Sequence, residues 1–106
     1  MREVDLTTFA AAHCDGAVVI DVREPFEYVA GHVPGAEAVP MSQLPSRSAD
    51  LPRGVPVYVI CASGNRSLAA ADFLARAGVD AWSVAGGTGA WIRAGHPVVH
   101  GARAVA

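Results

Sequence analysis

The sequence contains no lysine, because all eight of its basic residues are arginine. This absence excludes Schiff-base catalysis and a phosphate-binding P-loop, since both depend on a lysine side chain. Cysteine is also scarce: Cys14 and Cys61 are the two present, and their spacing is not CxxC. Two such cysteines make neither a disulfide framework nor a zinc site, so we expect a reducing compartment in which a thiol stays free.

Long apolar runs and strong charge are missing as well. No apolar run approaches transmembrane length, and the segment 1–5, which contains three charged residues, is not followed by the apolar segment of a signal peptide. Charged residues make up 17% of the chain and the net charge is −2, so the surface does not attract nucleic acid or an anionic membrane. We therefore expect a cytoplasmic protein that binds neither nucleic acid nor membrane.

The chain does contain enough apolar residues for one compact core. Its 106 residues are 52% apolar, and these residues are spread along the whole sequence. We expect a single domain over residues 1–106, with a core at about 4–98 and a C-terminal tail at 99–106.

Helical and strand patterns alternate along the chain. Helices are predicted at 6–13 (with Asp5 as N-cap), 25–30, 67–77 and 88–94, and strands at 17–22, 38–41, 55–60 and 80–84; residues 42–52 are expected to be a short helix or a loop. This alternation predicts an α/β domain with a mainly parallel central sheet and helices on both faces.

The most informative residue is Cys61. It follows the apolar run 57–60 and opens the segment 61–67, which leads directly into a helical pattern. The unpaired N–H groups of the loop and of the helix start point toward such a sulfur and favour its thiolate form. Arg66, at the helix entrance, adds a positive charge. Because active sites of parallel sheets lie beyond the carboxyl ends of the strands, this position indicates a cysteine-dependent enzyme.

Several further side chains are candidates for supporting roles. A cation at a helix start opposes the helix dipole, so Arg66 is expected to face an anion, either a substrate or a carboxylate such as Asp21 or Glu24. Asp21 and Arg23 are expected to act structurally, as a charged pair or as hydrogen-bond anchors near the loop. His32 lies in a turn and is expected to be hydrogen-bonded there.

Other candidates are interpreted as non-catalytic. Cys14 has no neighbouring cation in the sequence, so we expect it to be structural or incidental. His96 and His100 have helical spacing, but Pro97 lies between them and makes a metal site improbable.

Four segments together resemble the rhodanese family of sulfurtransferases. They are Ile-Asp-Val-Arg-Glu-Pro at 20–25, Gly-His-Val-Pro-Gly-Ala at 31–36, Cys-Ala-Ser-Gly-Asn-Arg-Ser at 61–67 and Val-Ala-Gly-Gly-Thr-Gly-Ala-Trp at 84–91. The similarity spans about residues 4–98 and implies a rhodanese-like fold.

This resemblance implies sulfur transfer without a metal or other cofactor. Cys61 would accept a sulfane sulfur from thiosulfate, polysulfide or a persulfide, hold it as a persulfide, and pass it to cyanide, a small thiol or a protein. The backbone of the loop would cradle that sulfur, through Ala62, Ser63, Gly64, Asn65 and Arg66, while Asp21, Arg23, His32 and Ser67 would support it. Many family members have arginine where this chain has Ala62, which favours a persulfide, polysulfide or protein donor over thiosulfate.

Two other classes of function use a similar loop or fold. Cysteine phosphatases and arsenate reductases resemble Cys-x5-Arg, whereas four residues separate Cys61 from Arg66 here, which predicts a tighter loop. A non-catalytic interaction module on the same fold would usually lack the loop cysteine, which this chain keeps.

Overall fold

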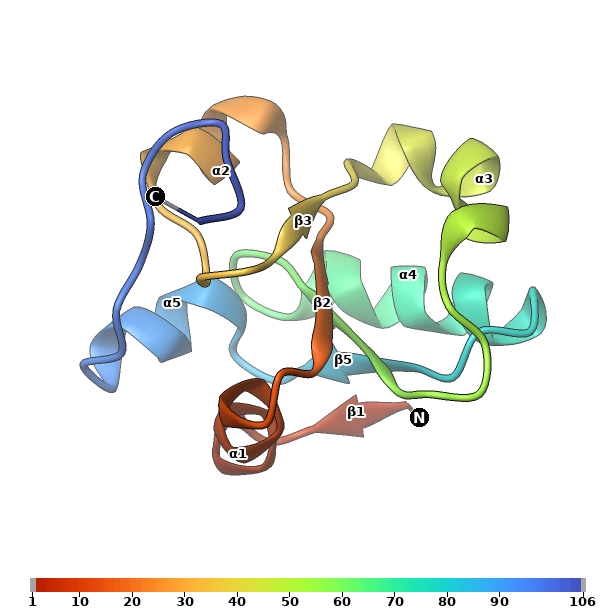
Figure 1. Cartoon of the computed structure of the whole chain (residues 1–106), viewed down its shortest axis with the longest axis horizontal. Helices are drawn as coiled ribbons and strands as arrows, with labels where there is room; N and C mark the ends of the chain where they lie inside the picture. The colour runs from red at the N-terminus through yellow and green to blue at the C-terminus, as the bar shows by residue number, and fades with distance from the viewer. Residues whose placement is uncertain (1, 106) are drawn as a thin grey trace.

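A five-stranded parallel sheet organises the computed structural model, which describes residues 2–105 (Figure 1). The strands lie in the order β1-β5-β4-β2-β3, and every neighbouring pair is parallel. The strands are β1 (Glu3–Val4), β2 (Val18–Asp21), β3 (Glu37–Ala38), β4 (Val57–Ile60) and β5 (Ala81–Val84). The helices are α1 (Leu6–Cys14), α2 (Pro25–Ala30), α3 (Leu44–Arg47), α4 (Asn65–Arg76) and α5 (Gly87–Arg93), with short 3-10 helices at Met41–Gln43 and Ser48–Asp50.

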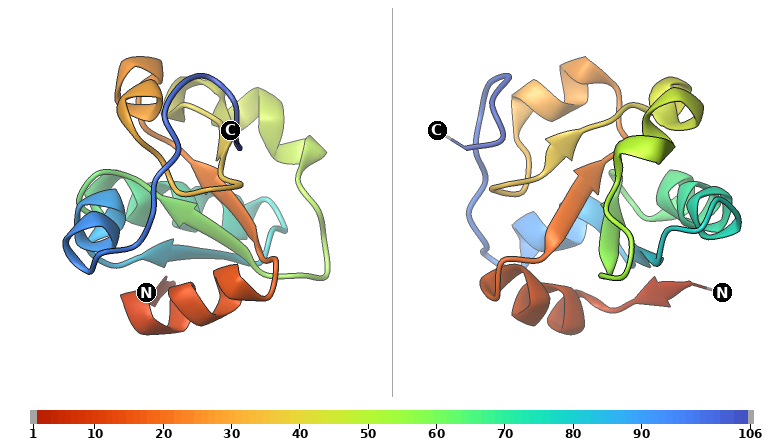
Figure 2. Two further views of the ribbon diagram at one scale, coloured as in Figure 1. Left: turned by 60° about the vertical axis from the view of Figure 1, so that its left-hand side comes forward. Right: turned by 45° about the vertical axis from the view of Figure 1, so that its right-hand side comes forward.

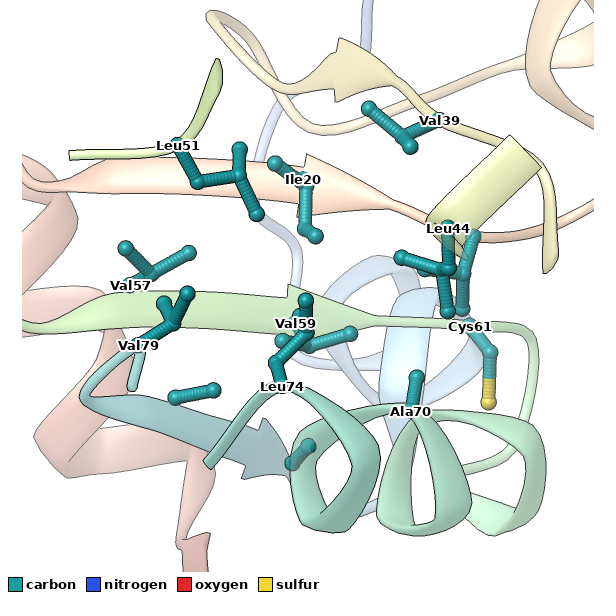
Figure 3. Packing of buried hydrophobic residues seen from close by; sticks show 13 residues of the cluster. Ile20, Val39, Leu44, Leu51, Val57, Val59, Cys61, Ala70, Leu74 and Val79 are labelled. Atoms are coloured by element: carbon teal, nitrogen blue, oxygen red, sulfur yellow. The ribbon is translucent and has the colours of Figure 1, made fainter. Parts of the chain in front are cut away.

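Alternation along the strands divides the core into two apolar clusters, one on each face of the sheet. On one face, strand residues such as Ile20 and Val59 pack with Leu74 of α4 and Leu44 of α3 (Figure 3). On the other face, Phe9 of α1 and Trp91 of α5 are buried against strand residues that include Val19, Ile60 and Val84. The predicted α/β architecture with helices on both faces is therefore confirmed, and the sheet is wholly parallel within the described residues.

Helices α1 and α2 lie at or close to their predicted ranges, with α1 ending one residue later, at Cys14. The side chain of Asp5 accepts a hydrogen bond from the Thr8 N–H, as expected of the N-cap of α1. Helix α2 spans the predicted residues 25–30, with Pro25 in its first turn. Helix α4 begins at Asn65 rather than at residue 67, because Gly64 adopts a left-handed conformation with φ of 104° and ends the loop there.

The strand predictions differ from the structure mainly beside prolines. The strand expected at 38–41 is instead β3, which ends at Ala38, and Met41 opens a 3-10 turn. Past Ala38 the N–H of Val39 still donates to the carbonyl of Asp21 at 2.9 Å, and the chain then turns at Pro40 into the 3-10 helix. Strand β4 begins at Val57, just after Pro56, which has no N–H to donate to a neighbouring strand. The two-residue strand β1 was not predicted, since so short a segment carries no periodic signal.

The C-terminal tail lies against the end of α2 and the following turn (Figure 2). Val99 forms an isolated antiparallel bridge with His32, and the N–H groups of Gly101 and Gly35 donate to the carbonyls of Val29 and Ala104, both at 2.9 Å. The tail is thus attached to the domain by backbone hydrogen bonds. None of the helices within residues 2–105 has the length and apolar character needed to cross a bilayer.

Candidate active site

Cys61 lies at the carboxyl end of β4, where the chain turns into the loop that precedes α4. Cys61 is 1% exposed, and it belongs to the same buried cluster as Leu44 and Ala70 (Figure 3). The structure therefore places the predicted nucleophile at the expected edge of the sheet.

Three groups form hydrogen bonds with the sulfur of Cys61. The N–H of Gly64 lies 3.1 Å from Sγ, the N–H of Ser67 lies 3.4 Å from it, and the Ser67 hydroxyl oxygen lies 3.3 Å from it. Burial alone would raise the pKa of the Cys61 thiol, but hydrogen bonds from Ser67, Gly64 and Ser63 outweigh that effect and hold this pKa below its ordinary value. The site favours a thiolate at neutral pH more than a free cysteine does.

Ser67 is connected to a second buried hydroxyl. The Ser67 and Ser83 hydroxyl oxygens lie 2.7 Å apart, and both residues are fully buried. Sequence reasoning included Ser67 but missed Ser83. The available signal was the alternation of β5, which places Ser83 on the same side of the strand as Ala81 and hence toward α4.

The start of α5 supports the loop from its other side. The N–H groups of Thr88 and Gly89 donate to the carbonyls of Cys61 and Ala62, at 2.8 and 3.0 Å. Since N–H and C=O point in opposite directions across a trans peptide, the bonded carbonyl of Ala62 directs the N–H of Ser63 away from α5, to the side where it interacts with the sulfur.

This contact requires glycine at position 87. A Cβ atom on Gly87 would lie 2.4 Å from the carbonyl oxygen of Cys61 and 2.7 Å from that of Ala62. The glycine-rich segment after β5 therefore provides close backbone approach to the reactive loop.

Arg66 forms a bidentate ion pair with Glu27 of α2. Its two terminal nitrogens donate to the two carboxylate oxygens of Glu27 at 2.8 and 2.9 Å. The same carboxylate accepts the N–H of Glu24 at 3.0 Å, as part of a capping box. The hydrogen bonds from Arg66 outweigh partial burial and lower the pKa of Glu27 to about 2, so Glu27 is ionised at neutral pH.

Glu27 was missed by the sequence analysis, which named Asp21 or Glu24 as candidate carboxylate partners of Arg66. In the structure, the carboxylate that pairs with Arg66 is that of Glu27. A signal was available, because Glu27 stands three residues after Glu24 in a helix that follows β2 at the same edge of the sheet. Spacing within α2 alone, however, does not show which of its carboxylates reaches α4.

Asp21 and Arg23 form the charged pair that was predicted. The Arg23 side chain donates to both carboxylate oxygens of Asp21, the shortest contact being 2.8 Å, and also to the carbonyl of Gly31 at 2.8 Å. The two residues are 1% and 7% exposed. This buried pair ties the end of β2 to the end of α2.

His32 is a hydrogen-bonded turn residue, as predicted. Its ring nitrogens lie 2.8 Å from the carbonyl oxygen of Tyr28 and 2.7 Å from that of Arg103. The ring stacks on Tyr28, and the residue is completely buried. The ring therefore connects α2, through Nδ1, to the C-terminal tail, through Nε2.

The remaining predicted residues separate into the loop and more distant positions. Ala62 is half-buried, while Ser63 and Asn65 are exposed at the loop surface. Cys14 is exposed on α1, which lies with α5 on the face opposite α4. A cradle of loop N–H groups around a second sulfur atom stays a prediction.

The arrangement is suited to nucleophilic chemistry at sulfur. The loop favours the thiolate form of Cys61, and Arg66 provides a cation at its end. Four residues separate Cys61 from Arg66. Attack of a thiolate on a sulfane sulfur needs no general base. The described hydrogen bonds to the Cys61 sulfur come from Gly64 and Ser67, and neither residue is a general base.

Comparison with known proteins agrees with this geometry. The family model for the rhodanese-like domain matches residues 7–94. The chain is 34% identical to a sulfurtransferase of Allochromatium vinosum over 102 residues, which cover 93% of this chain and 95% of that protein. It is 41% identical to the thiosulfate sulfurtransferase GlpE of Pseudomonas putida over 86 residues, covering 78% and 76% of the two chains. The crystal structure of a rhodanese-related protein from Thermoplasma volcanium superposes with a TM-score of 0.86 at 37% identity, covering 93% of this chain and 98% of the other.

Proposed function

Because this chain belongs to the rhodanese-like domain family, we propose that it is a sulfurtransferase in which Cys61 carries the transferred sulfur. The observation that supports this most directly is the set of hydrogen bonds at Cys61 Sγ, from the N–H groups of Gly64 and Ser67 and with the Ser67 hydroxyl. Such donors stabilise a thiolate, and a persulfide anion carries the same charge one atom further out.

The proposed reaction has two displacement steps. In the first, the Cys61 thiolate attacks the outer sulfur of a donor R–S–SH and the donor's S–S bond breaks. The persulfide Cys61–S–S⁻ forms on the protein, and the leaving thiolate takes the proton of the outer sulfur and departs as RSH. With thiosulfate as the donor, sulfite would leave instead. In the second step, an acceptor such as cyanide attacks the outer sulfur, which gives thiocyanate and regenerates the Cys61 thiolate. A small thiol or a protein thiol is an alternative acceptor.

The test is the intact-protein mass before and after exposure to polysulfide or thiosulfate. The protein is expected to gain one sulfur atom, which cyanide or dithiothreitol then removes. Cys61→Ser should abolish this adduct, whereas Cys14→Ser should retain it, because Cys14 lies exposed on another helix. Sulfur loading that survives in Cys61→Ser would refute the proposal.

A further inference from the structure

Two arginines near the reactive loop are both matched by carboxylates. Arg66 is paired with Glu27, and Arg23 is paired with Asp21. The pKa of Arg66 is raised chiefly by the hydrogen bonds to Glu27. Smaller contributions to this rise include the negative charges of Cys61 and Asp21. The four side chains together carry no net charge.

This neutralisation bears on what the loop can bind. A free arginine beside Cys61 would attract a doubly charged donor such as thiosulfate through its guanidinium group. Here both terminal nitrogens of that group are already occupied by Glu27, at 2.8 and 2.9 Å. The carboxylate of Glu27 remains as a negative charge on the guanidinium of Arg66.

The ion pair is also held in place from the side of α2. Glu27 accepts the Glu24 N–H at 3.0 Å while it binds Arg66, so its position is fixed by the helix start as well as by the arginine. An incoming anion therefore competes with a carboxylate that is already oriented, and displacing it would break three hydrogen bonds.

We infer that Glu27 is a specificity-determining residue that selects donors carrying at most one negative charge, such as alkyl persulfides, against the thiosulfate dianion. This inference rests on the proposed sulfurtransferase function and concerns the choice of donor at the same site. Glu27 acts by neutralising Arg66 and by repelling a second negative charge. The half-buried Ala62 adds no cation that would offset this effect.

The experiment measures kcat/KM for thiosulfate and for an alkyl persulfide in the same variants. Glu27→Gln removes the charge but keeps a side-chain oxygen that can accept the Glu24 N–H, so α2 keeps its cap. This variant is expected to raise kcat/KM for thiosulfate roughly five- to tenfold, and to change the value for the persulfide less than about twofold.

Glu24→Gln is the matched control. Glu24 is an exposed carboxylate on the same helix end, but its charge does not pair with Arg66. The control should leave the ratio of thiosulfate to persulfide kcat/KM nearly unchanged. An equal rise in both variants would mean that the overall charge of the protein is responsible and would overturn the role given to Glu27.

A second pair of variants tests the same inference should Glu27→Gln fold poorly. Arg66→Ala exposes the Glu27 carboxylate, so thiosulfate kcat/KM is expected to fall roughly tenfold or more. Adding Glu27→Gln to Arg66→Ala should then recover part of this loss, because the repelling charge is gone. No recovery in the double variant would contradict the inference.

The outcomes separate this inference from the proposed function. If both donors load Cys61 and Glu27→Gln leaves their ratio unchanged, the donor-selection role of Glu27 is wrong while the sulfurtransferase function stands. A uniform rise for both donors would mean that Glu27 affects the loop's shape, which also overturns donor selection. If neither donor loads Cys61 in the unmodified protein, the proposed function itself fails.

Discussion

The hydroxyl oxygens of Ser67 and Ser83 lie 2.7 Å apart in a fully buried pair, and Ser67 also contacts the sulfur of Cys61. Each hydroxyl has a single proton to donate. When Cys61 is a thiolate, the Ser67 proton points to sulfur, so the Ser67 oxygen accepts the proton of Ser83. The pair thus forms a short chain of donors that ends on the reactive atom.

Ser67→Ala should therefore move the pH dependence of Cys61 reactivity. The thiolate loses a donor, which disfavours the charged form, so the midpoint of this pH dependence should rise. The measurement is the rate of alkylation of Cys61 against pH, in a Cys14→Ser background. Ser83→Ala should shift the midpoint in the same direction by less, since it acts through Ser67.

Ser63→Ala is the control for this experiment. Ser63 acts on the sulfur through its backbone N–H, which alanine keeps, and its side chain is exposed. The pH midpoint of Cys61 alkylation in Ser63→Ala should match that of the parent. An unchanged midpoint in Ser67→Ala would show that the hydroxyl does not stabilise the thiolate.

Arg23→Ala should strongly destabilise the fold. It leaves the carboxylate of Asp21 buried without its cation, a change that typically costs about 3–5 kcal/mol. Arg47→Ala is the matched control, because the pair of Arg47 with Glu37 is largely exposed and is worth less than about 1 kcal/mol. Urea unfolding of both variants measures the difference, and equal losses would refute a structural role for the buried pair.

Ala62→Arg should lower KM for thiosulfate while leaving the persulfide reaction little changed. The new guanidinium would bring to the loop a cation that the Glu27–Arg66 pair does not neutralise. Steady-state kinetics with both donors measures this, with Ala69→Arg as a control that adds the same charge at an exposed position of α4. Equal KM values in the parent and Ala62→Arg would show that position 62 does not face the donor.

Lengthening the loop should weaken persulfide formation. One glycine inserted after Gly64 gives Cys-x5-Arg spacing and moves the N–H groups that follow it, including that of Ser67, relative to the sulfur. The parent is expected to show no aryl phosphatase activity, because its loop is too tight to seat a tetrahedral phosphate. Sulfur loading, phosphate inhibition and aryl phosphate hydrolysis are compared in the two proteins.

The control insertion belongs in an exposed turn away from the site. A glycine added beside Gly54, which has open space around it, should leave sulfur loading intact. Robust turnover of aryl phosphate by the parent would instead favour the phosphatase hypothesis over sulfur transfer.

Local signals in the sequence predicted much of this structure. The cap at Asp5, the proline at the start of α2 and the apolar run before Cys61 each depend on neighbouring residues, and each prediction was confirmed. The main errors lie beside prolines: the apolar pattern at 38–41 contains Pro40, where the chain turns into a 3-10 helix, and Pro56 precedes the start of β4.

The site was harder to predict where residues from separate elements meet. Glu27 reaches Arg66 across 39 positions of sequence, and Ser83 reaches Ser67 across 16. Periodicity shows which face of an element is buried, but the pairing of side chains between elements depends on how helices cross the sheet. Cys61 was predictable because its environment is formed largely by the seven residues that begin with it.

The bonds from Thr88 and Gly89 to the loop carbonyls have a consequence for how this protein matures. The acidity of Cys61 depends on a loop whose shape is fixed by a helix that follows it by more than twenty residues. In a nascent chain that has not yet folded this last helix onto the sheet, we expect the N–H of Ser63 to be lost from the donors that lower the pKa of the Cys61 thiol. The nucleophile becomes fully reactive only in the finished molecule, so its rate of alkylation at neutral pH reports whether the C-terminal third of the domain has reached its native position.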